Sequence, residues 1–458
     1  MMEEKKQGET WYWRFLVCGC IALSCVVLII IGIVAGDEDA LANIFREGTL
    51  VQTETVYLTV ILAFLLPAAI LAITIVILAH GRGFLWMGKK ERKKAKQDDG
   101  VRFRALASID RGAAQAQVPA RVGEVPMFRI CEDFRAYAAA NLHLYYEPED
   151  IRRFVAGFAV SHLMIMQGLS GTGKTSLATA FGAFLGNPSA VISVQPMWKE
   201  RADVIGYFNE FTKQFNESAL LKRLYEARYS DDICIIVLDE MNIARVEYFF
   251  ADFLSLMELN PADRCLEMTS DSWEKDPLLF ENGRFRIPTN VWFIGTANND
   301  DSTFAISDKV YDRAMVMNLD TKAKPFSAAQ SGGMRLSYSG FCKAVEHAKE
   351  AYSMTARNRR KVAEIDRYLT ENYHITYGNR IRKQMEEYIS LYIACGGTEE
   401  EALDDFLMKK VLRKLEGQNP VVIAKAGKAL GLKITELFGY DSMPLCRSYL
   451  HYLCQSVS

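Results

Sequence analysis

The chain has 458 residues, of which 50% are hydrophobic, and its formal net charge at pH 7 is -2. This length and apolar content allow a large buried core and more than one domain. The near-neutral charge argues against a general affinity for nucleic acid. The 10 cysteines include no Cys-x-x-Cys pair. They therefore predict neither a zinc site nor a disulfide framework, and reduced, mostly buried thiols are the favoured interpretation.

Two segments, residues 15–35 and 56–79, contain no charged residue. Each is long enough to cross the ~30 Å hydrocarbon core of a bilayer as a helix. A cleaved signal peptide is the alternative for the first segment, but the run is long for such a peptide and a second apolar run follows it. Lys and Arg residues are concentrated before the first segment and after the second, which predicts that both ends of the pair face the cytoplasm.

The residues after the second apolar segment are basic. The run KKERKKAK, residues 89–96, either contacts anionic lipid headgroups or acts as a topology signal followed by a solvated linker, and the second interpretation is favoured. No strong helical or strand period is present up to about Pro126. This region is therefore interpreted as a tether between the membrane and a globular part.

A glycine-rich stretch, GLSGTGKTS, follows the apolar stretch HLMIMQ and precedes the helix-like stretch SLATAFGAFLG. The spacing Gly-x-x-x-x-Gly-Lys-Thr between a strand and a helix is typical of a loop that wraps a nucleotide phosphate, because backbone N–H groups and the helix N-terminus point to the anion. A glycine-rich turn without a ligand is the alternative. The predicted nucleotide-binding residues of this loop are Gly168, Leu169, Ser170, Gly171, Thr172, Gly173, Lys174, Thr175 and Ser176.

The lysine and the threonine of this loop have separate predicted roles. Lys174 contacts the β and γ phosphates, and the Thr175 hydroxyl binds Mg²⁺. The apolar stretch DICIIVLDE ends in Asp239 and Glu240. Two carboxylates at the tip of a buried strand repel each other and lose hydration, an arrangement that makes sense if a cation or a reacting water lies there. We therefore expect Asp239 to hold the Mg²⁺ shell and Glu240 to polarise the attacking water, and a helix cap by Asp239 is the alternative.

From about Val125 to Ser458, the order of the motifs resembles the AAA+ ATPases, in particular the branch with McrB-type, MoxR-type and dynein-related modules. DEMNIAR resembles the DE-x-N-R pattern of McrB-type proteins. MKKVLRKLEGQ resembles their lid segment, with Arg413 in place of a proline. The resemblance implies an α/β fold in which a P-loop core, a parallel sheet flanked by helices, is followed by an α-helical lid.

Residues 291–319 resemble the strand that carries the polar sensor of this family and the arginine finger that follows it. By position, Asn298 matches the sensor, which orients the lytic water, and Arg313 matches the finger, which neutralises charge on a neighbour's γ-phosphate. A turn-capping amide is the alternative for Asn298, and an ion pair with Asp308 or Asp312 is the alternative for Arg313. A finger that acts in trans implies a homo-oligomeric ring, with a hexamer as one candidate.

The resemblance also suggests two further contact regions. Arg380 is the candidate lid arginine that contacts phosphate, with Arg382 as second choice and a solvated helix face as the alternative. Trp198, Tyr207 and Phe208 lie in the stretch QPMWKERADVIGYFNEF, which related rings place at the central pore. Aromatic residues are more often part of a core, and this is the alternative for all three.

These patterns divide the chain into successive regions, and the Pro/Gly/Ser-rich hinge should let the core and the lid move relative to each other. The regions are a cytoplasmic tail (1–14), a first transmembrane helix (15–35), a short extracytoplasmic loop (36–55), a second transmembrane helix (56–79), a basic juxtamembrane linker (80–125), a nucleotide-binding core (126–320), the hinge (321–337) and a helical lid (338–458).

The expected protein is a membrane-anchored ATPase with two spans in the lipid bilayer and its catalytic domain in the cytoplasm. Mg²⁺-dependent binding and hydrolysis of ATP would drive remodelling or gating of an unidentified partner near the membrane. One alternative is a nucleotide-controlled membrane scaffold or switch with slow turnover, as in stress or phage defence. Another is an McrB-like GTPase, because McrB-type relatives use GTP. Recruitment of a nuclease to DNA is disfavoured, because no strongly basic domain is present.

Overall fold

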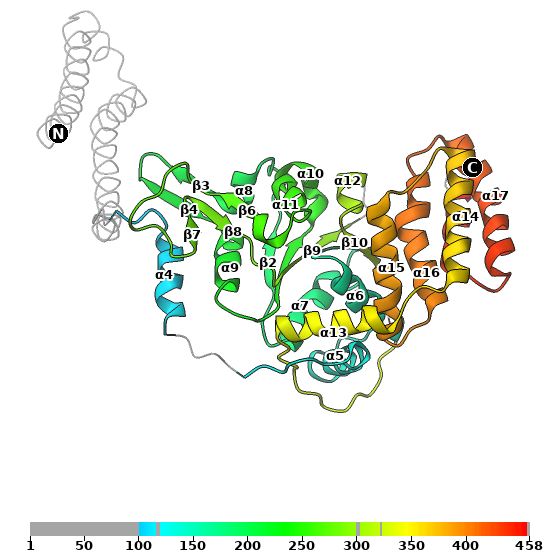
Figure 1. Ribbon diagram of the computed structural model, residues 1–458, viewed down its shortest axis with the longest axis horizontal. Coiled ribbons are helices and arrows are strands. Elements are labelled where there is room, and N and C mark those ends of the chain that lie inside the picture. Colours follow the sequence, from blue (N-terminus) through cyan, green and yellow to red (C-terminus); the bar gives the residue numbers. More distant parts are fainter. Residues whose placement is uncertain (1–99, 116–119, 299–302, 321–322, 456–458) are drawn as a thin grey trace, which may run out of the picture. The chain divides into compact units, whose positions relative to one another are not determined.

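The computed structural model describes residues 100–115, 120–298, 303–320 and 323–455 (Figure 1). The predicted tail, membrane spans, extracytoplasmic loop and most of the basic linker lie outside the described residues. Among the described residues, no helix combines the length and the apolar character needed to cross a bilayer.

A five-stranded parallel sheet organises the described region, in the order β10-β1-β9-β5-β2. The predicted strands HLMIMQ, DICIIVLDE and VWFIGTA form β1, β5 and β9, which lie side by side and confirm the α/β class. Every residue of β1 and β9 is buried, as expected for inner strands covered on both faces. The strands are β1 (Leu163–Gln167), β2 (Ala190–Ser193), β5 (Cys234–Asp239), β9 (Val291–Ala297) and β10 (Met315–Asn318).

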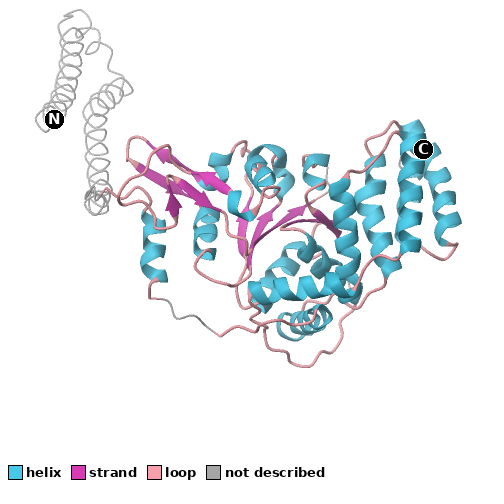
Figure 2. Ribbon diagram, in the orientation of Figure 1, coloured by secondary structure: helices cyan, strands magenta, loops and turns pink. Residues whose placement is uncertain are grey.

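Helices cover both faces of this sheet (Figure 2). They are α5 (Met127–Leu142), α6 (Pro148–Val160), α7 (Lys174–Phe184), α8 (Arg201–Ile205), α9 (Ala219–Ala227), α10 (Val246–Phe249), α11 (Ala251–Leu256) and α12 (Asp308–Tyr311), with 3₁₀ turns η1 (Met241–Ile243) and η2 (Pro261–Asp263). Along β1, Met164 and Met166 belong to a hydrophobic cluster with α5, α6 and α7, whereas Leu163 and Ile165 belong to a second cluster with α8, α9, α10 and α11. Successive strand side chains point to opposite faces, so the two clusters lie on the two sides of the sheet.

Two small antiparallel elements accompany the main sheet. They are the hairpin of β3 (Gly206–Asn209) and β4 (Gln214–Glu217), and a three-stranded sheet of β6 (Cys265–Glu267), β8 (Arg284–Arg286) and β7 (Phe280–Glu281).

Of the three aromatic residues proposed for a central pore, Tyr207 and Phe208 lie on the β3–β4 hairpin and Trp198 precedes α8. Tyr207 is 52% exposed, and Phe211 at the hairpin tip is 99% exposed. Trp198 and Phe208 pack against the second hydrophobic cluster, and the Trp198 ring lies 5.5 Å from that of Phe249. The core alternative therefore describes Trp198 and Phe208, whereas Tyr207 and Phe211 are exposed.

Helix α4 (Arg104–Ala113) lies within the stretch that the sequence analysis interprets as a tether. Just before it, an Arg102 nitrogen contacts an oxygen of Asp276 at 2.6 Å, 174 residues further along the chain. Phe103 is fully buried, and its ring stacks on Phe215 at 4.8 Å. Local periodicity could not predict this docked helix, because the residues that fix it are distant in the sequence.

The chain after residue 337 is helical, as predicted, and the first hydrophobic cluster continues from α6 into this region. Its elements are α13 (Tyr338–Ala351), α14 (Ala356–Tyr373), α15 (Asn379–Ala394), α16 (Glu399–Phe406), the π-helix η3 (Leu407–Val411), the 3₁₀ turn η4 (Leu412–Leu415), α17 (Pro420–Phe438) and α18 (Pro444–Gln455).

The predicted hinge returns to the core before the helical region begins. Among its described residues, the Met334 N–H donates to the Phe184 carbonyl oxygen at 2.6 Å. Helix α13 then packs on the core, with the Phe341 ring 5.7 Å from Phe158 and 5.8 Å from Trp292. The predicted start of the lid at residue 338 is not a boundary of the hydrophobic core, because α13 contributes apolar residues to the first hydrophobic cluster.

Buried charges join the C-terminal region to the core at the π-helix. The Lys409 Nζ lies 2.6 Å from an Asp405 oxygen, which also lies 3.1 Å from Arg153 Nε in α6. The neighbouring Lys410 donates through Nζ to the Tyr311 carbonyl oxygen at the end of α12, and burial lowers the pKa of Lys410 to about 7. The segment that resembles the McrB-type lid is therefore fastened to two core helices.

Candidate nucleotide-binding site

The predicted phosphate loop connects β1 to the N-terminus of α7. Gly168, Gly171 and Gly173 have φ angles of +140°, +77° and +92°, which residues with side chains rarely adopt. At Gly168 there is also no space, because an added Cβ would lie 2.6 Å from the Leu319 carbonyl oxygen. Glycine at these positions lets the backbone N–H groups curve around an anion at the start of a helix.

Lys174 turns back onto this loop. Its Nζ donates to the carbonyl oxygens of Gly168 at 2.9 Å and of Leu169 at 2.8 Å. Burial lowers the pKa of Lys174, and three nearby carboxylates oppose that shift. A cation held by neutral carbonyl groups inside an anion-binding loop can exchange these contacts for phosphate oxygens, as the prediction for Lys174 requires.

The two predicted metal ligands lie in contact. The Thr175 hydroxyl, in the first turn of α7, donates to Asp239 Oδ1 at 2.7 Å, and the Thr296 hydroxyl of β9 donates to the same oxygen at 2.9 Å. Hydroxyl and carboxylate oxygens are the hard ligands that Mg²⁺ prefers, so this donor set fits a magnesium ion. Thr296 belongs to no motif, and sequence reasoning does not identify it.

Glu240 is held in an unusual backbone conformation. Its φ and ψ angles are 53° and 47°, in the left-handed region that costs energy for a residue with a Cβ. The Glu240 N–H donates to Thr296 Oγ1 at 2.9 Å, and the residue is exposed whereas Asp239 is partly buried. The turn therefore gives the two adjacent acids different surroundings, which agrees with the different roles predicted for them.

Asn242, within the DEMN stretch, fixes the predicted sensor. Its side chain is buried, with Nδ2 donating to the Asn298 carbonyl oxygen at 2.8 Å and Oδ1 accepting from the Asn298 N–H at 3.3 Å. Asn298 directly follows β9, the strand that lies between β1 and β5 in the sheet. With Gln167 and Tyr311 it lines a cavity of about 350 Å³. The DE-x-N pattern was the available signal for Asn242, but sequence reasoning assigns it no role.

Arg313 and Arg380 meet at one carboxylate that the sequence analysis does not consider. Arg313 Nε lies 2.7 Å from Glu258 Oε1, and Arg380 Nη2 lies 2.5 Å from the same oxygen. The alternative partners Asp308 and Asp312 instead contact residues of η4, so neither is the ion-pair partner of Arg313. None of the ion pairs or hydrogen bonds of the two arginines in the described part of the chain involves the phosphate loop.

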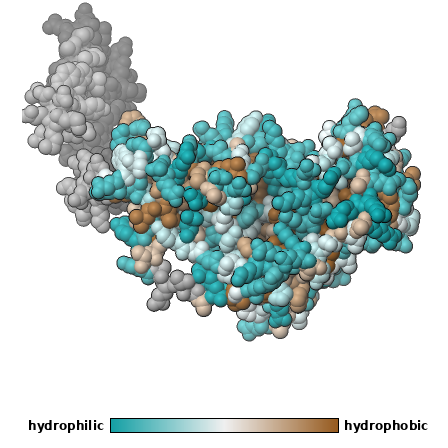
Figure 3. All heavy atoms as spheres, in the orientation of Figure 1, coloured by the Kyte–Doolittle hydropathy of each residue, from teal (hydrophilic) through white to brown (hydrophobic). Residues whose placement is uncertain are grey.

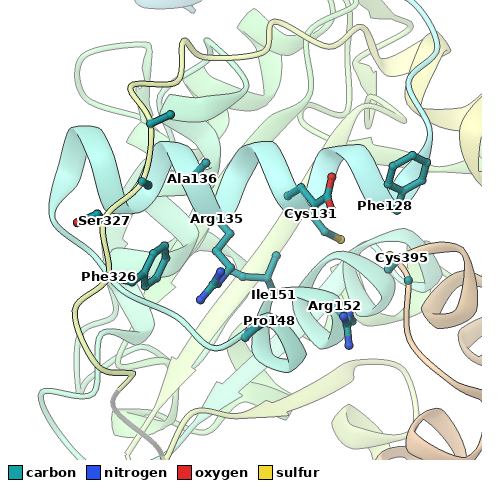
Figure 4. Close-up of a pocket in the computed structure, with 14 residues that line it drawn as sticks. Phe128, Cys131, Arg135, Ala136, Pro148, Ile151, Arg152, Phe326, Ser327 and Cys395 are labelled. Atoms are coloured by element: carbon teal, nitrogen blue, oxygen red, sulfur yellow. The ribbon is translucent and has the colours of Figure 1, made fainter.

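A larger cavity, of about 660 Å³, lies among α5, the start of α6, the linker after β10 and the end of α15 (Figure 4). Arg135 extends from α5 toward Phe326, and its guanidinium carbon lies 3.9 Å from the centre of that ring. Arg135 Nε also donates to the Tyr146 carbonyl oxygen at 2.9 Å. The Tyr146 hydroxyl lies beside the phosphate loop, 3.9 Å from the position of a Cβ added at Gly173. Tyr146 therefore connects Arg135, which lines the cavity, to the phosphate loop at Gly173.

Together these contacts define a class of site. A glycine-rich loop between a parallel strand and a helix encloses a lysine, and the adjacent threonine is hydrogen-bonded to the aspartate at the end of β5. This is the site of a P-loop nucleotide hydrolase.

Comparisons with known proteins identify the domain. Residues 163–314 match the AAA domain of the dynein-related subfamily, and residues 334–453 match a domain of unknown function (DUF8727). No curated protein matches the chain. The solved structure of a candidate ATPase from Cytophaga hutchinsonii is similar at 11% identity and a TM-score of 0.40, over 74% of this chain and 97% of that chain. Residues 163–314 are therefore an AAA-type domain, and the predicted class of enzyme, a P-loop ATPase, is confirmed.

Proposed function

We propose that this ATPase binds ATP with Mg²⁺ and hydrolyses it between the subunits of an oligomeric ring. The contact from Thr175 Oγ1 to Asp239 Oδ1, 2.7 Å long, is the observation that carries the proposal, because it joins the phosphate loop to the acidic strand end. Bound Mg²⁺ would supply positive charge against the phosphate oxygens, and these two residues would hold it.

The other residues of the site act on phosphate and water. Lys174 binds the phosphate groups inside the loop, and Glu240 accepts a hydrogen bond from the attacking water and takes up its proton. Asn298, whose backbone Asn242 holds in place, orients the same water. The exposure of Glu240 supports this role, because a general base must be reachable by solvent.

The position of the arginines supports action on a neighbouring copy. Arg313 and Arg380 are joined to Glu258 and, in the described part of the chain, to no residue of their own phosphate loop. An arginine that is fixed in this way can reach the phosphate of the next subunit in a ring, which is how arginine fingers supplied in trans act.

The ring is proposed to be anchored in a membrane by residues 15–35 and 56–79, with the ATPase domain in the cytoplasm, and to remodel or gate a partner there. Exposure of Tyr207 and Phe211 on the β3–β4 hairpin supports contact with such a partner, since exposed aromatic residues are frequent at binding surfaces.

Phosphate release by the full-length chain in detergent tests the reaction and the base. We expect hydrolysis of ATP that requires Mg²⁺ and stops when the metal is chelated. Hydrolysis of GTP but not ATP would favour the McrB-like GTPase, and hydrolysis of neither nucleotide would contradict the proposal.

Mixing two strongly impaired variants tests whether Arg313 acts in trans. Glu240→Gln subunits keep the arginine, and Arg313→Ala subunits keep the base, so an equal mixture recreates complete interfaces. If the copies assort at random, about a quarter of the wild-type rate should return. If Arg313 acts within its own subunit, the mixture stays as inactive as either variant.

A further inference from the structure

Glu258 joins three separate elements of the described chain at one point. It lies just after α11, two residues beyond the last helical residue, and contacts Arg313 before β10 and Arg380 in the first turn of α15. Both contacts use the same oxygen, Oε1. Neither the predicted roles of the two arginines nor any motif accounts for this carboxylate.

The backbone of Arg313 is already fixed without Glu258. Its carbonyl oxygen accepts from Ser161 Oγ at 3.0 Å and from Gln384 Nε2 at 3.5 Å, and its Nη1 donates to the Lys309 carbonyl oxygen at 2.7 Å. Ser161 lies just before β1, and Gln384 lies on α15, so the main chain is held by the core and by the C-terminal helices. The Nη1 contact already holds one side of the guanidinium, so Glu258 adds a second contact, at Nε, and keeps the guanidinium close to that of Arg380.

The charges at this point do not cancel. Two guanidinium groups share one carboxylate, which leaves one net positive charge on an exposed surface. The side chains are 23% exposed at Arg313, 45% at Arg380 and 34% at Glu258, so the ion pairs themselves add little to stability. Without the carboxylate, the two cations would repel each other and separate. Glu258 thus keeps the guanidinium groups of Arg313 and Arg380 close together. Both side chains are partly exposed, so an anion can reach them from solvent.

We propose that Glu258 is a positioning residue that sets Arg313 and Arg380 as a pair for the phosphate groups of a nucleotide held by a neighbouring copy. This inference rests on the proposed function, since it requires a neighbour. Guanidinium groups bind phosphate through several N–H donors in a fixed plane, and Glu258 occupies only part of this capacity in each arginine. The remaining donors stay available to the phosphate.

The steady-state kinetics of full-length variants test the proposal. Glu258→Ala and the size-matched Glu258→Gln should each lower kcat for ATP about tenfold and leave KM within about threefold, because the arginines act after the nucleotide is bound in the other subunit. Glu258→Asp should recover part of the loss. Asp252→Ala is the matched control on α11, because it removes the exposed ion pair with Arg201 and should leave kcat unchanged.

The kcat of a double variant at Glu258 and Arg313 distinguishes a positioning role from general damage to the fold, because effects that act through the same arginine do not add. If Glu258 acts through Arg313, adding Glu258→Gln to Arg313→Ala should lower kcat little further, whereas independent roles would multiply. An unchanged or increased kcat in both single Glu258 variants, or a multiplied loss in the double variant, would overturn the inference. If Arg313→Ala alone leaves kcat unchanged, the proposed trans-acting arginine itself is wrong, and that result is distinct from a failure at Glu258.

Discussion

Lys174 and Glu240 have different surroundings, and a different loss is expected from each. Lys174 lies inside the phosphate loop, whereas Glu240 is an exposed carboxylate on a left-handed turn. Lys174→Ala should therefore abolish nucleotide binding, and Glu240→Gln should keep binding and lose hydrolysis. Binding of a fluorescent ATP analogue and release of phosphate measure the two effects. Equal loss of binding in both variants would contradict the division of roles.

Thr296 offers a test of the network around Asp239. Its hydroxyl donates to Asp239 Oδ1 and accepts from the Glu240 N–H, so Thr296→Val removes both contacts while keeping the shape of the side chain. Loss of a residue that orients a metal ligand should weaken Mg²⁺ binding about 10-fold or more. A Mg²⁺ titration of hydrolysis measures this shift. Thr296→Ser keeps the hydroxyl and should behave as wild type, and an equal shift in both variants would exclude the hydroxyl as the cause.

At the residue scale, the sequence was informative where the chemistry is local. The phosphate loop and the Asp239–Glu240 pair could be predicted because spacing and a preceding apolar strand are visible within a short window. Thr296 and Glu258 could not be predicted, since their partners come from other strands and helices that only the fold brings close.

At the element scale, the docking of helix α4 can be tested at Phe103. The ring is fully buried and contacts Phe215 and Phe280 at 4.8 and 4.9 Å between ring centres. Phe103→Ala should lower the free energy of unfolding by about 3–5 kcal/mol, the usual cost of truncating a buried aromatic residue. Urea unfolding followed by tryptophan fluorescence measures the change.

The control for this variant is Leu278→Ala, because Leu278 lies near the same elements but is 77% exposed. It should change the free energy of unfolding by less than about 0.5 kcal/mol. Similar small effects in both variants would show that α4 is not held by Phe103.

Elements were predictable when their own sequence carried the pattern. Strands β1, β5 and β9 are short apolar runs, and the helices after residue 337 show helical periods, so both could be predicted. The attachment of α4 and of α13 could not, because it depends on Arg102, Phe103 and Phe341 contacting residues far away in the chain.

At the scale of the whole molecule, the contacts before α4 couple the start of the described region to the β3–β4 hairpin. Arg102 and Phe103 are fixed close to the point where the described region begins, and the Phe215 N–H of the β3–β4 hairpin donates to the Arg102 carbonyl oxygen at 2.8 Å. A displacement of this hairpin is therefore transmitted to Arg102 and Phe103 through a hydrogen bond and buried side chains.

The membrane topology is a prediction for the whole chain: the Lys/Arg asymmetry predicts that the chain after residue 79 lies in the cytoplasm, where ATP and Mg²⁺ are available. In a variant with the native cysteines replaced, a cysteine at Asn43 should react with an impermeant thiol reagent added to intact cells. A cysteine at Gln97 should react only after lysis. Labelling of Gln97→Cys in intact cells would invert the membrane assignment and separate the ATPase domain from its nucleotide.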